Sequence, residues 1–187
     1  MKAIILGNGP SLTKFYKGQI AELTFGVNRI YNLPKVHLDY FVALDKTVWS
    51  EASMEIKKLD CKQYFVWERY YEYAYNATSL KTLYPLKFLN KGEGFKSFKE
   101  GVHHYNCSIA PCLQIAKELR ATEISLYGVD CGCYIEQKSH FYGDRRCKIR
   151  QWKRQEENLG KLFSILNIPI TVFSDLFQGK NCNIVKD

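Results

Sequence analysis

The sequence predicts an α/β fold: a Rossmann-like, mostly parallel sheet with helices on both faces. Two observations support this. Short apolar runs of strand length alternate with segments of helical periodicity, which is the pattern of βαβ units. The first run, residues 3–6, stops at a Gly-Asn-Gly-Pro stretch, where the backbone can turn sharply. Because the chain has 187 residues and no internal repeat or linker, we expect a single domain spanning 1–187.

The first half of the chain continues this alternation. Further strands are expected at residues 23–27, 40–44 and 64–67, with a helix across 47–58. From about 68 to 105 the chain is rich in Tyr, Phe, Lys and Gly. We expect an irregular, partly helical insertion there, which could serve as a lid, a subunit interface or core.

Regular periodicity returns at Ser108, a good N-cap for a helix with Pro111 in its first turn. A strand is expected at 123–130. A long helix then ends near Asn167, a plausible residue for the position just after a helix. Residues 169–173 are expected to form the last strand.

Composition favours an anionic partner. The net charge of +8 suits a nucleotide, nucleic acid, lipopolysaccharide or membrane surface, and the densest basic run spans 145–154. No apolar stretch reaches the ~20 residues that span a bilayer, and the first apolar run is too short for a signal peptide. We therefore expect a cytoplasmic protein with reduced cysteines, which could associate peripherally with a membrane.

Short polar residues follow the first three predicted strands: Asn8, Asn28 and Asp45. In an open parallel sheet, the carboxyl ends of the strands line one crevice where ligands bind. We therefore expect these three side chains to converge on one ligand. The alternative is that Asn and Asp stand there because they favour turns and helix caps.

The loop at Gly7 and Gly9 predicts an anion site by its layout. A strand, a glycine turn and a helix start together allow bare amides and a helix N-terminus to face an anion. Ser11 could cap that helix. Only two glycines occur, so the spacing matches neither the phosphate loop nor the dinucleotide fingerprint. A plain tight turn is the alternative.

Several blocks of the chain resemble the bacterial sialyltransferases of glycosyltransferase family 42. They also resemble the broader group of domain-of-unknown-function-115 proteins, found in phages and flagellar glycosylation loci, which includes archaeal 6-hydroxymethylpterin diphosphokinases. The blocks occur in the family's order. They are IILGNGPSL at 4–12, FGVNRIY at 25–31, FVALD at 41–45, the stretch 108–130, and SHFYGD at 139–144.

The resemblance implies a sialyltransferase-like fold and metal-independent transfer from a nucleotide-activated donor, which could be CMP-linked. It implies that Asn8, Asn28 and Asp45 hold the nucleotide and that Ser108 contacts the donor. Arg145 and Arg146, at the start of the basic run, could hold donor phosphates or an anionic acceptor. The full set of candidate donor-binding residues is Asn8, Gly9, Pro10, Ser11, Asn28, Asp45, Ser108, Asp130, Tyr134, Arg145 and Arg146.

Three positions depart from the sialyltransferase pattern. Tyr105 stands where those enzymes place an arginine for the sialic acid carboxylate, and a phenol cannot replace a bidentate cation. Those enzymes use two tyrosines to steady the departing phosphate; Gly132 occupies the place of one, and Tyr134 lies near the place of the other. Asp144 aligns with the general-base histidine and His140 with an earlier histidine, so either one is a candidate base for the acceptor hydroxyl.

The leading hypothesis is a glycosyltransferase-like enzyme that transfers a sugar from a nucleotide-activated donor to a hydroxyl acceptor, without a metal cofactor. His103 and His104, just before the helix at Ser108, are further candidates for its base. The resemblance also admits a homo-oligomer.

Two alternatives stay open. The first is an Mg²⁺-dependent diphosphokinase of the hydroxymethylpterin type, with Asp45 and Asp130 at neighbouring strand ends holding the metal. The second is a non-catalytic nucleotide- or nucleic-acid-binding module of phage origin. A nucleic-acid site would show affinity that falls steeply with salt.

Overall fold

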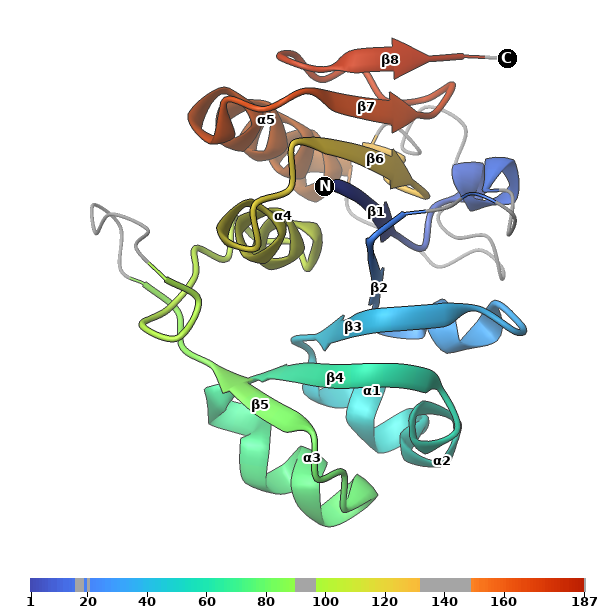
Figure 1. Ribbon diagram of the computed structural model, residues 1–187, viewed down its shortest axis with the longest axis vertical. Helices are drawn as coiled ribbons and strands as arrows, with labels where there is room; N and C mark the ends of the chain where they lie inside the picture. The colour runs from blue at the N-terminus through green and yellow to red at the C-terminus, as the bar shows by residue number, and fades with distance from the viewer. Residues whose placement is uncertain (16–18, 20, 90–96, 132–148, 187) are drawn as a thin grey trace.

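The computed structural model describes residues 1–15, 19, 21–89, 97–131 and 149–186. Within these residues the chain forms one eight-stranded sheet with helices packed on both faces (Figure 1). Each pair of neighbouring strands is parallel. The predicted Rossmann-like α/β fold is confirmed.

The strand order is β5-β4-β3-β2-β1-β6-β7-β8, so β1 lies in the middle of the sheet. The chain builds outward from β1 to β5 and then returns to place β6 against the other side of β1. The strands are β1 (Lys2–Leu6), β2 (Leu23–Val27), β3 (His37–Ala43), β4 (Asp60–Trp67), β5 (Leu83–Leu86), β6 (Glu123–Tyr127), β7 (Ile170–Phe173) and β8 (Asn183–Val185).

Alternate side chains of the strands enter two separate cores. In β1, Ala3 and Ile5 pack on the face covered by α4 and α5, while Ile4 and Leu6 pack on the face covered by α1, α2 and α3. The helices are α1 (Lys46–Glu51), α2 (Ser53–Lys57), α3 (Tyr71–Thr78), α4 (Ile109–Glu118) and α5 (Ile149–Leu166), with 3-10 turns η1 (Pro10–Lys14), η2 (Asn28–Asn32) and η3 (Glu68–Tyr70).

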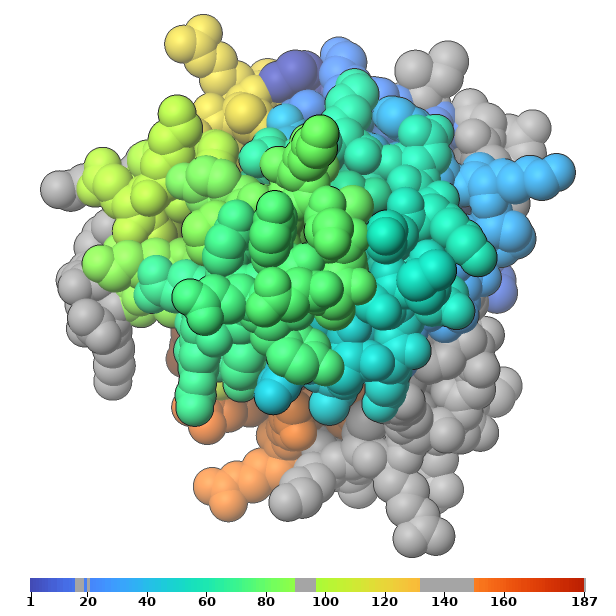
Figure 2. Space-filling view, turned by 90° about the horizontal axis from the view of Figure 1, so that it is seen from below, coloured from blue at the N-terminus to red at the C-terminus, as the bar shows by residue number. Residues whose placement is uncertain are grey.

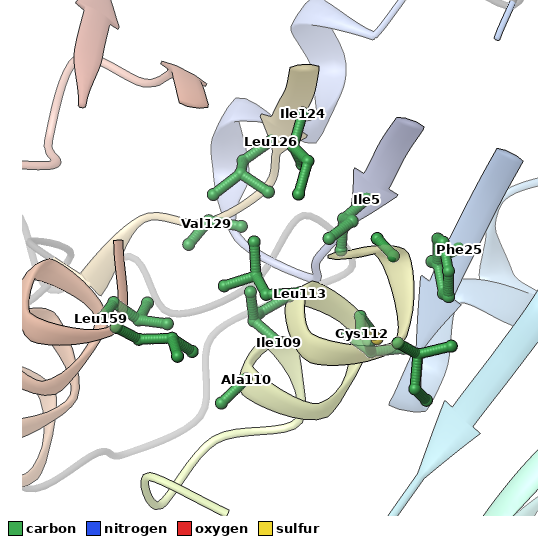
Figure 3. Close-up of a cluster of buried hydrophobic side chains, with 14 of the residues drawn as sticks. Ile5, Phe25, Ile109, Ala110, Cys112, Leu113, Ile124, Leu126, Val129 and Leu159 are labelled. Carbon is green, nitrogen blue, oxygen red and sulfur yellow. The ribbon is translucent and has the colours of Figure 1, made fainter. Parts of the chain in front are cut away.

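Helix α4 lies beside α5 on one face of the sheet, and it is buried along most of its length (Figure 1). Figure 3 shows its side chains among those of β1, β2, β6 and α5. Leu113 is fully buried in this cluster. Burying a leucine side chain contributes roughly 1.5–3 kcal/mol, so this contact fixes where α4 begins relative to the strand ends.

Three boundaries differ from the sequence prediction. The helix expected across 47–58 is divided at Ala52, whose φ of −140° and ψ of 30° leave the helical region. The strand expected to run to residue 130 ends at Tyr127, because Gly128 turns the chain with φ of +67°. The strand at 170–173 is followed by β8, so it is not the last. Asn167, with φ of 51°, follows α5 as expected.

The aromatic-rich segment at about 68–105 is more regular than the expected insertion. It contains α3, and β5 extends the sheet beside β4. Phe65, Tyr84 and Phe98 contact one another edge to face, so much of the aromatic density is core. Tyr73 and Tyr75 of α3 are exposed. Atoms of this part of the chain, coloured green, lie at the centre of the face turned to the viewer in Figure 2.

Candidate functional site

A pocket of about 290 Å³ opens at the carboxyl ends of the central strands. It lies where the strand order reverses, with β2 on one side of β1 and β6 on the other. Ligands of open α/β sheets bind at this point, because the connections from adjacent strands leave toward opposite faces there. Ile109, Val129 and Leu159 line the pocket and also belong to the core cluster of Figure 3. The cluster therefore forms an apolar floor.

Six of the predicted donor-binding residues line this pocket together. Asn8 and Gly9 follow β1, Asn28 follows β2, and Asp45 follows β3. Ser108 precedes α4, and Asp130 comes shortly after β6. The six are Asn8, Gly9, Asn28, Asp45, Ser108 and Asp130. The structure thus brings these polar residues at the strand ends to one hollow.

Asn8 presents an acceptor that none of the described residues satisfies. Its Nδ2 donates to the carbonyl oxygen of Val27 at 2.9 Å, which fixes the orientation of the amide. Its Oδ1 is buried and has no hydrogen-bond partner among the described residues. Leaving a buried acceptor unpaired costs about 1–3 kcal/mol, so a ligand that donates a hydrogen bond here would recover that energy.

Asn28 and Ser108 join the second strand to the central helix. Asn28 adopts a left-handed conformation with φ of 49°, which asparagine tolerates better than most residues. Its Oδ1 accepts a hydrogen bond from the Ser108 hydroxyl at 3.2 Å. Ser108 does occupy the N-cap position of α4, but its side chain makes no capping hydrogen bond. The hydroxyl instead faces Asn28, just after β2, contrary to the capping prediction.

The amides of the glycine loop are not bare. Gly7 N–H donates to the Tyr127 carbonyl at 2.7 Å, and Gly9 N–H donates to the Gly128 carbonyl at 2.8 Å. These two donors are used within the protein where β1 and β6 end, so they are not free to bind an anion. The helix start is also weaker than expected, since η1 is a 3-10 turn of five residues.

Ser11 does not cap η1. Its N–H donates to Oδ2 of Asp130 at 2.7 Å, and its hydroxyl accepts from Gly128 N–H at 3.1 Å. Pro10 and Ser11 line a second hollow, with Lys14 and Asp175, rather than the main pocket. Pro10 and Ser11 were predicted to bind the nucleotide, but they lie beside the main pocket and do not line it.

Asp130 fastens three segments together. Besides Ser11, its carboxylate accepts a hydrogen bond from the hydroxyl of Ser174, just after β7. Burial raises the pKa of Asp130, while the hydrogen bonds from Ser174 and Ser11 act in the opposite direction. A Cβ on Gly9 would overlap this carboxylate, so the glycine is required by close packing. Both carboxylate oxygens are already engaged within the protein.

The magnesium site of the diphosphokinase alternative does not fit this arrangement. Asp45 follows β3 and Asp130 follows β6, and both β2 and β1 lie between them, so they are not at neighbouring strand ends. Among the described residues, no three His, Cys, Asp or Glu side chains gather as metal ligands.

Among the described residues, His104 is the histidine that lines the pocket. Its ring stacks on Phe88 with centroids 4.8 Å apart. Burial lowers the pKa of His104, and the Asp45 carboxylate acts to raise it. His103 does not line the pocket and instead contacts the Tyr105 ring.

Sequence reasoning missed the contribution of α5. Gln151, Gln155 and Leu159 line the pocket from one face of this helix, together with Trp152. Their spacing of four residues places them on one side of a helix, and this signal was available in the sequence. Tyr134, His140, Asp144, Arg145 and Arg146 lie outside the described residues.

The ionisable lining that the structure describes contains no lysine or arginine. It consists of Asp45, Asp130, His104 and the thiols of Cys107 and Cys131. Burial raises the pKa of Cys107 to about 11, so this thiol stays protonated at neutral pH. Neutral amides and hydroxyls therefore dominate the polar surface.

A Rossmann-like sheet with its pocket at the central reversal defines the class of fold. No protein-family model matches the chain, and no curated protein sequence matches it. Among the described helices, none combines the length and the apolar character that crossing a bilayer requires.

Solved structures then specify the class further. The chain is similar to the sialyltransferase CstII from Campylobacter jejuni in complex with cytidine-5′-monophosphate, at 16% identity and a TM-score of 0.57, covering 96% of this chain and 84% of that chain. A CST-II variant in complex with CMP gives 16% identity and a TM-score of 0.61 over 98% and 87% of the two chains. The apo α-2,3-sialyltransferase from Campylobacter jejuni gives 17% identity and a TM-score of 0.50 over 98% and 82%. At these identities the likeness establishes a shared fold.

Proposed function

We propose that this protein is a glycosyltransferase-like enzyme that takes a sugar from a nucleotide-activated donor and transfers it to a hydroxyl acceptor. The observation that supports this most strongly is the unpaired, buried Oδ1 of Asn8 beside Asn28 and Ser108, at the reversal point of the sheet. The fold shared with structures that hold CMP agrees with it.

The nucleoside is the part of the donor that this lining suits. Oδ1 of Asn8 would accept from a base amino group or a ribose hydroxyl, and Asn28 and Ser108 offer further neutral polar groups. Asp45, exposed at the rim, would accept from sugar hydroxyls. We propose that Arg145, Arg146 and Tyr134 meet the phosphates.

We propose that the donor sugar carries no carboxylate that the protein must bind at the position of Tyr105. The phenol stands where the resemblance expects an arginine, and the described lining supplies no cation in its place. We propose a cytoplasmic enzyme, because all five cysteines in the described chain are free thiols, which suits a reducing compartment.

Nucleotide binding is tested by thermal shift with CMP, UDP, GDP and ATP plus Mg²⁺. A nucleotide at about 100 times its Kd stabilises the fold by ~2.7 kcal/mol. We expect Asn8→Ala to weaken binding at least tenfold, or about 1.4 kcal/mol. The matched control is Asn76→Ala, which removes an exposed amide on α3 and should bind like wild type.

The same screen, combined with an assay of transfer and hydrolysis, separates the alternatives. No stabilisation by any nucleotide contradicts the proposal. A response to ATP plus Mg²⁺ alone favours the diphosphokinase. Binding that depends on Asn8, with no transfer or hydrolysis from CMP-, UDP- or GDP-linked sugars, favours the non-catalytic module.

A further inference from the structure

The segment that leads into α4 has an unusual backbone. Tyr105 and Asn106 are consecutive left-handed residues, with φ of 47° and 58°. Side chains other than glycine rarely adopt this conformation twice in succession, because each instance crowds Cβ against the backbone. Such strain persists only where surrounding contacts fix it, and it gathers at functional sites.

Three side-chain amides from two helices hold this segment. Gln114, 1% exposed in the middle of α4, accepts from His103 N–H at 2.9 Å and donates to the His103 carbonyl at 2.8 Å. From α5, Gln155 donates to the Asn106 carbonyl at 2.7 Å, and Asn158 donates to the Tyr105 carbonyl at 3.3 Å. The backbone on either side of His104 is therefore fixed.

This support directs one imidazole to the pocket. The ring of His104 stacks on Phe88, and Phe88 in turn packs against Trp67, with centroids 4.9 Å apart. With its plane set by Phe88, His104 lines the same hollow as Asp45 and Ser108.

Other titratable groups of the described lining are poorly suited to accept a proton. The carboxylate of Asp130 is buried and occupied by Ser11 and Ser174. Cys107 is held in its thiol form, and Cys131 is buried. Asp45 is exposed at the rim of the pocket.

We propose that His104 is the general base of the transfer, with Asp45 stabilising the imidazolium that forms; this rests on the proposed glycosyltransferase function. The imidazole takes the proton of the acceptor hydroxyl as its oxygen bonds to the anomeric carbon. The bond from that carbon to the phosphate oxygen breaks, and the nucleotide leaves with the electron pair. The proton on His104 then returns to solvent.

The electrostatics of the ring agree with this role. Burial lowers the pKa of His104, so the imidazole is neutral and able to accept a proton at neutral pH. Asp45, after β3, is the described carboxylate that acts on it. Of its neighbours in the chain, Tyr105 and Cys107 both have a raised pKa and are uncharged.

Kinetics of the full chain test the assignment, with CMP-sialic acid, UDP-glucose, UDP-galactose and GDP-mannose as donors and lactose as acceptor. We expect His104→Gln to lower kcat by about 10²–10⁴ while nucleotide binding stays near wild type. Because burial lowers the pKa of His104, wild-type kcat should fall only at a pH below the usual imidazole pKa of about 6.5, and this acid limb should vanish in the variant. The matched control, His103→Gln, should keep both kcat and the limb.

Each outcome decides between the two proposals. Turnover by His104→Gln close to wild type, with its acid limb intact, overturns the role of His104 and leaves the transferase standing. If the acid limb is lost in His140→Gln and kept in His104→Gln, the role of His104 is likewise overturned and the transferase still stands. Absence of turnover in the wild type counts against the transferase itself.

A second measurement does not depend on turnover. The imidazole signal missing from the proton NMR spectrum of His104→Gln identifies His104. We expect it to titrate below the usual pKa of about 6.5, to move lower in Asp45→Asn, and to shift on adding CMP or UDP. The proposal is overturned if His104 titrates at the usual imidazole pKa and that pKa changes neither in Asp45→Asn nor on adding a nucleotide.

Discussion

Two segments meet at the reversal point of the sheet and contribute to the pocket in opposite ways. The loop after β1 has the stronger sequence signal, yet its amides are used against Tyr127 and Gly128. The segment at 103–106 has little signal, yet amides of α4 and α5 hold it so that His104 faces the pocket. A glycine turn between strand and helix thus specifies close backbone packing as readily as anion binding. The hydrogen-bond partners of its amides distinguish the two.

The largest effect that this comparison predicts is on folding, from Gly7. A Cβ there would overlap the Gly128 carbonyl, which is backbone and cannot move aside cheaply. We expect Gly7→Ala to lower the free energy of unfolding by about 3 kcal/mol or more, measured by urea denaturation.

Gly160 provides the matched control, since a Cβ on this α5 residue would come no closer than 3.4 Å to its neighbours. Gly160→Ala should stay within about 1 kcal/mol of wild type, because alanine favours the helix. Equal costs for the two substitutions would contradict close packing as the reason for Gly7.

An intermediate effect on stability and activity is expected from Gln114, one of the side-chain amides that hold the segment 103–106. Gln114→Leu leaves the N–H and carbonyl of His103 without their partner, which should cost about 2 kcal/mol of stability. It should also lower kcat while nucleotide affinity is kept, because His104 loses its fixed position. Gln63→Leu in β4 is the control. Full activity in Gln114→Leu would show that the amide serves folding alone.

The smallest effect concerns the left-handed backbone. Asn106 is exposed with φ of 58°, so its conformation matters more than its contacts. We expect Asn106→Ala to cost roughly 1 kcal/mol and Asn106→Gly to be nearly neutral, by thermal denaturation. The same loss for both substitutions would mean that the side chain, and not the backbone angle, stabilises the turn.

Much of the fold could be predicted because buried parallel strands are continuous apolar runs. The run ending at Leu6 and the strand Leu23–Val27 were found on that basis. Strand β5 was missed because it contains Pro85, which argues against a strand except at a sheet edge. Strand β8 has three residues and no fully buried position, so it has no apolar run to detect.

The site could be predicted only in part. Polar residues at strand ends gave Asn8, Asn28 and Asp45, because the geometry of parallel sheets brings such ends together. Which hydrogen bonds each polar atom makes could not be predicted from the sequence. Whether an amide is bare or a serine caps a helix depends on partners far along the chain, such as Asp130 for Ser11. The orientation of His104 depends in the same way on Gln114.

The central place of β1 has a consequence for how the molecule is made. This strand is synthesised before the other seven strands of the sheet, but its second edge stays open until residues 123–127 have been synthesised. Until then a row of unsatisfied peptide groups at Ala3 to Leu6 is a template for pairing with other chains. Nascent protein halted before β6 is therefore the species most prone to aggregate, and timely synthesis of the second half protects the first.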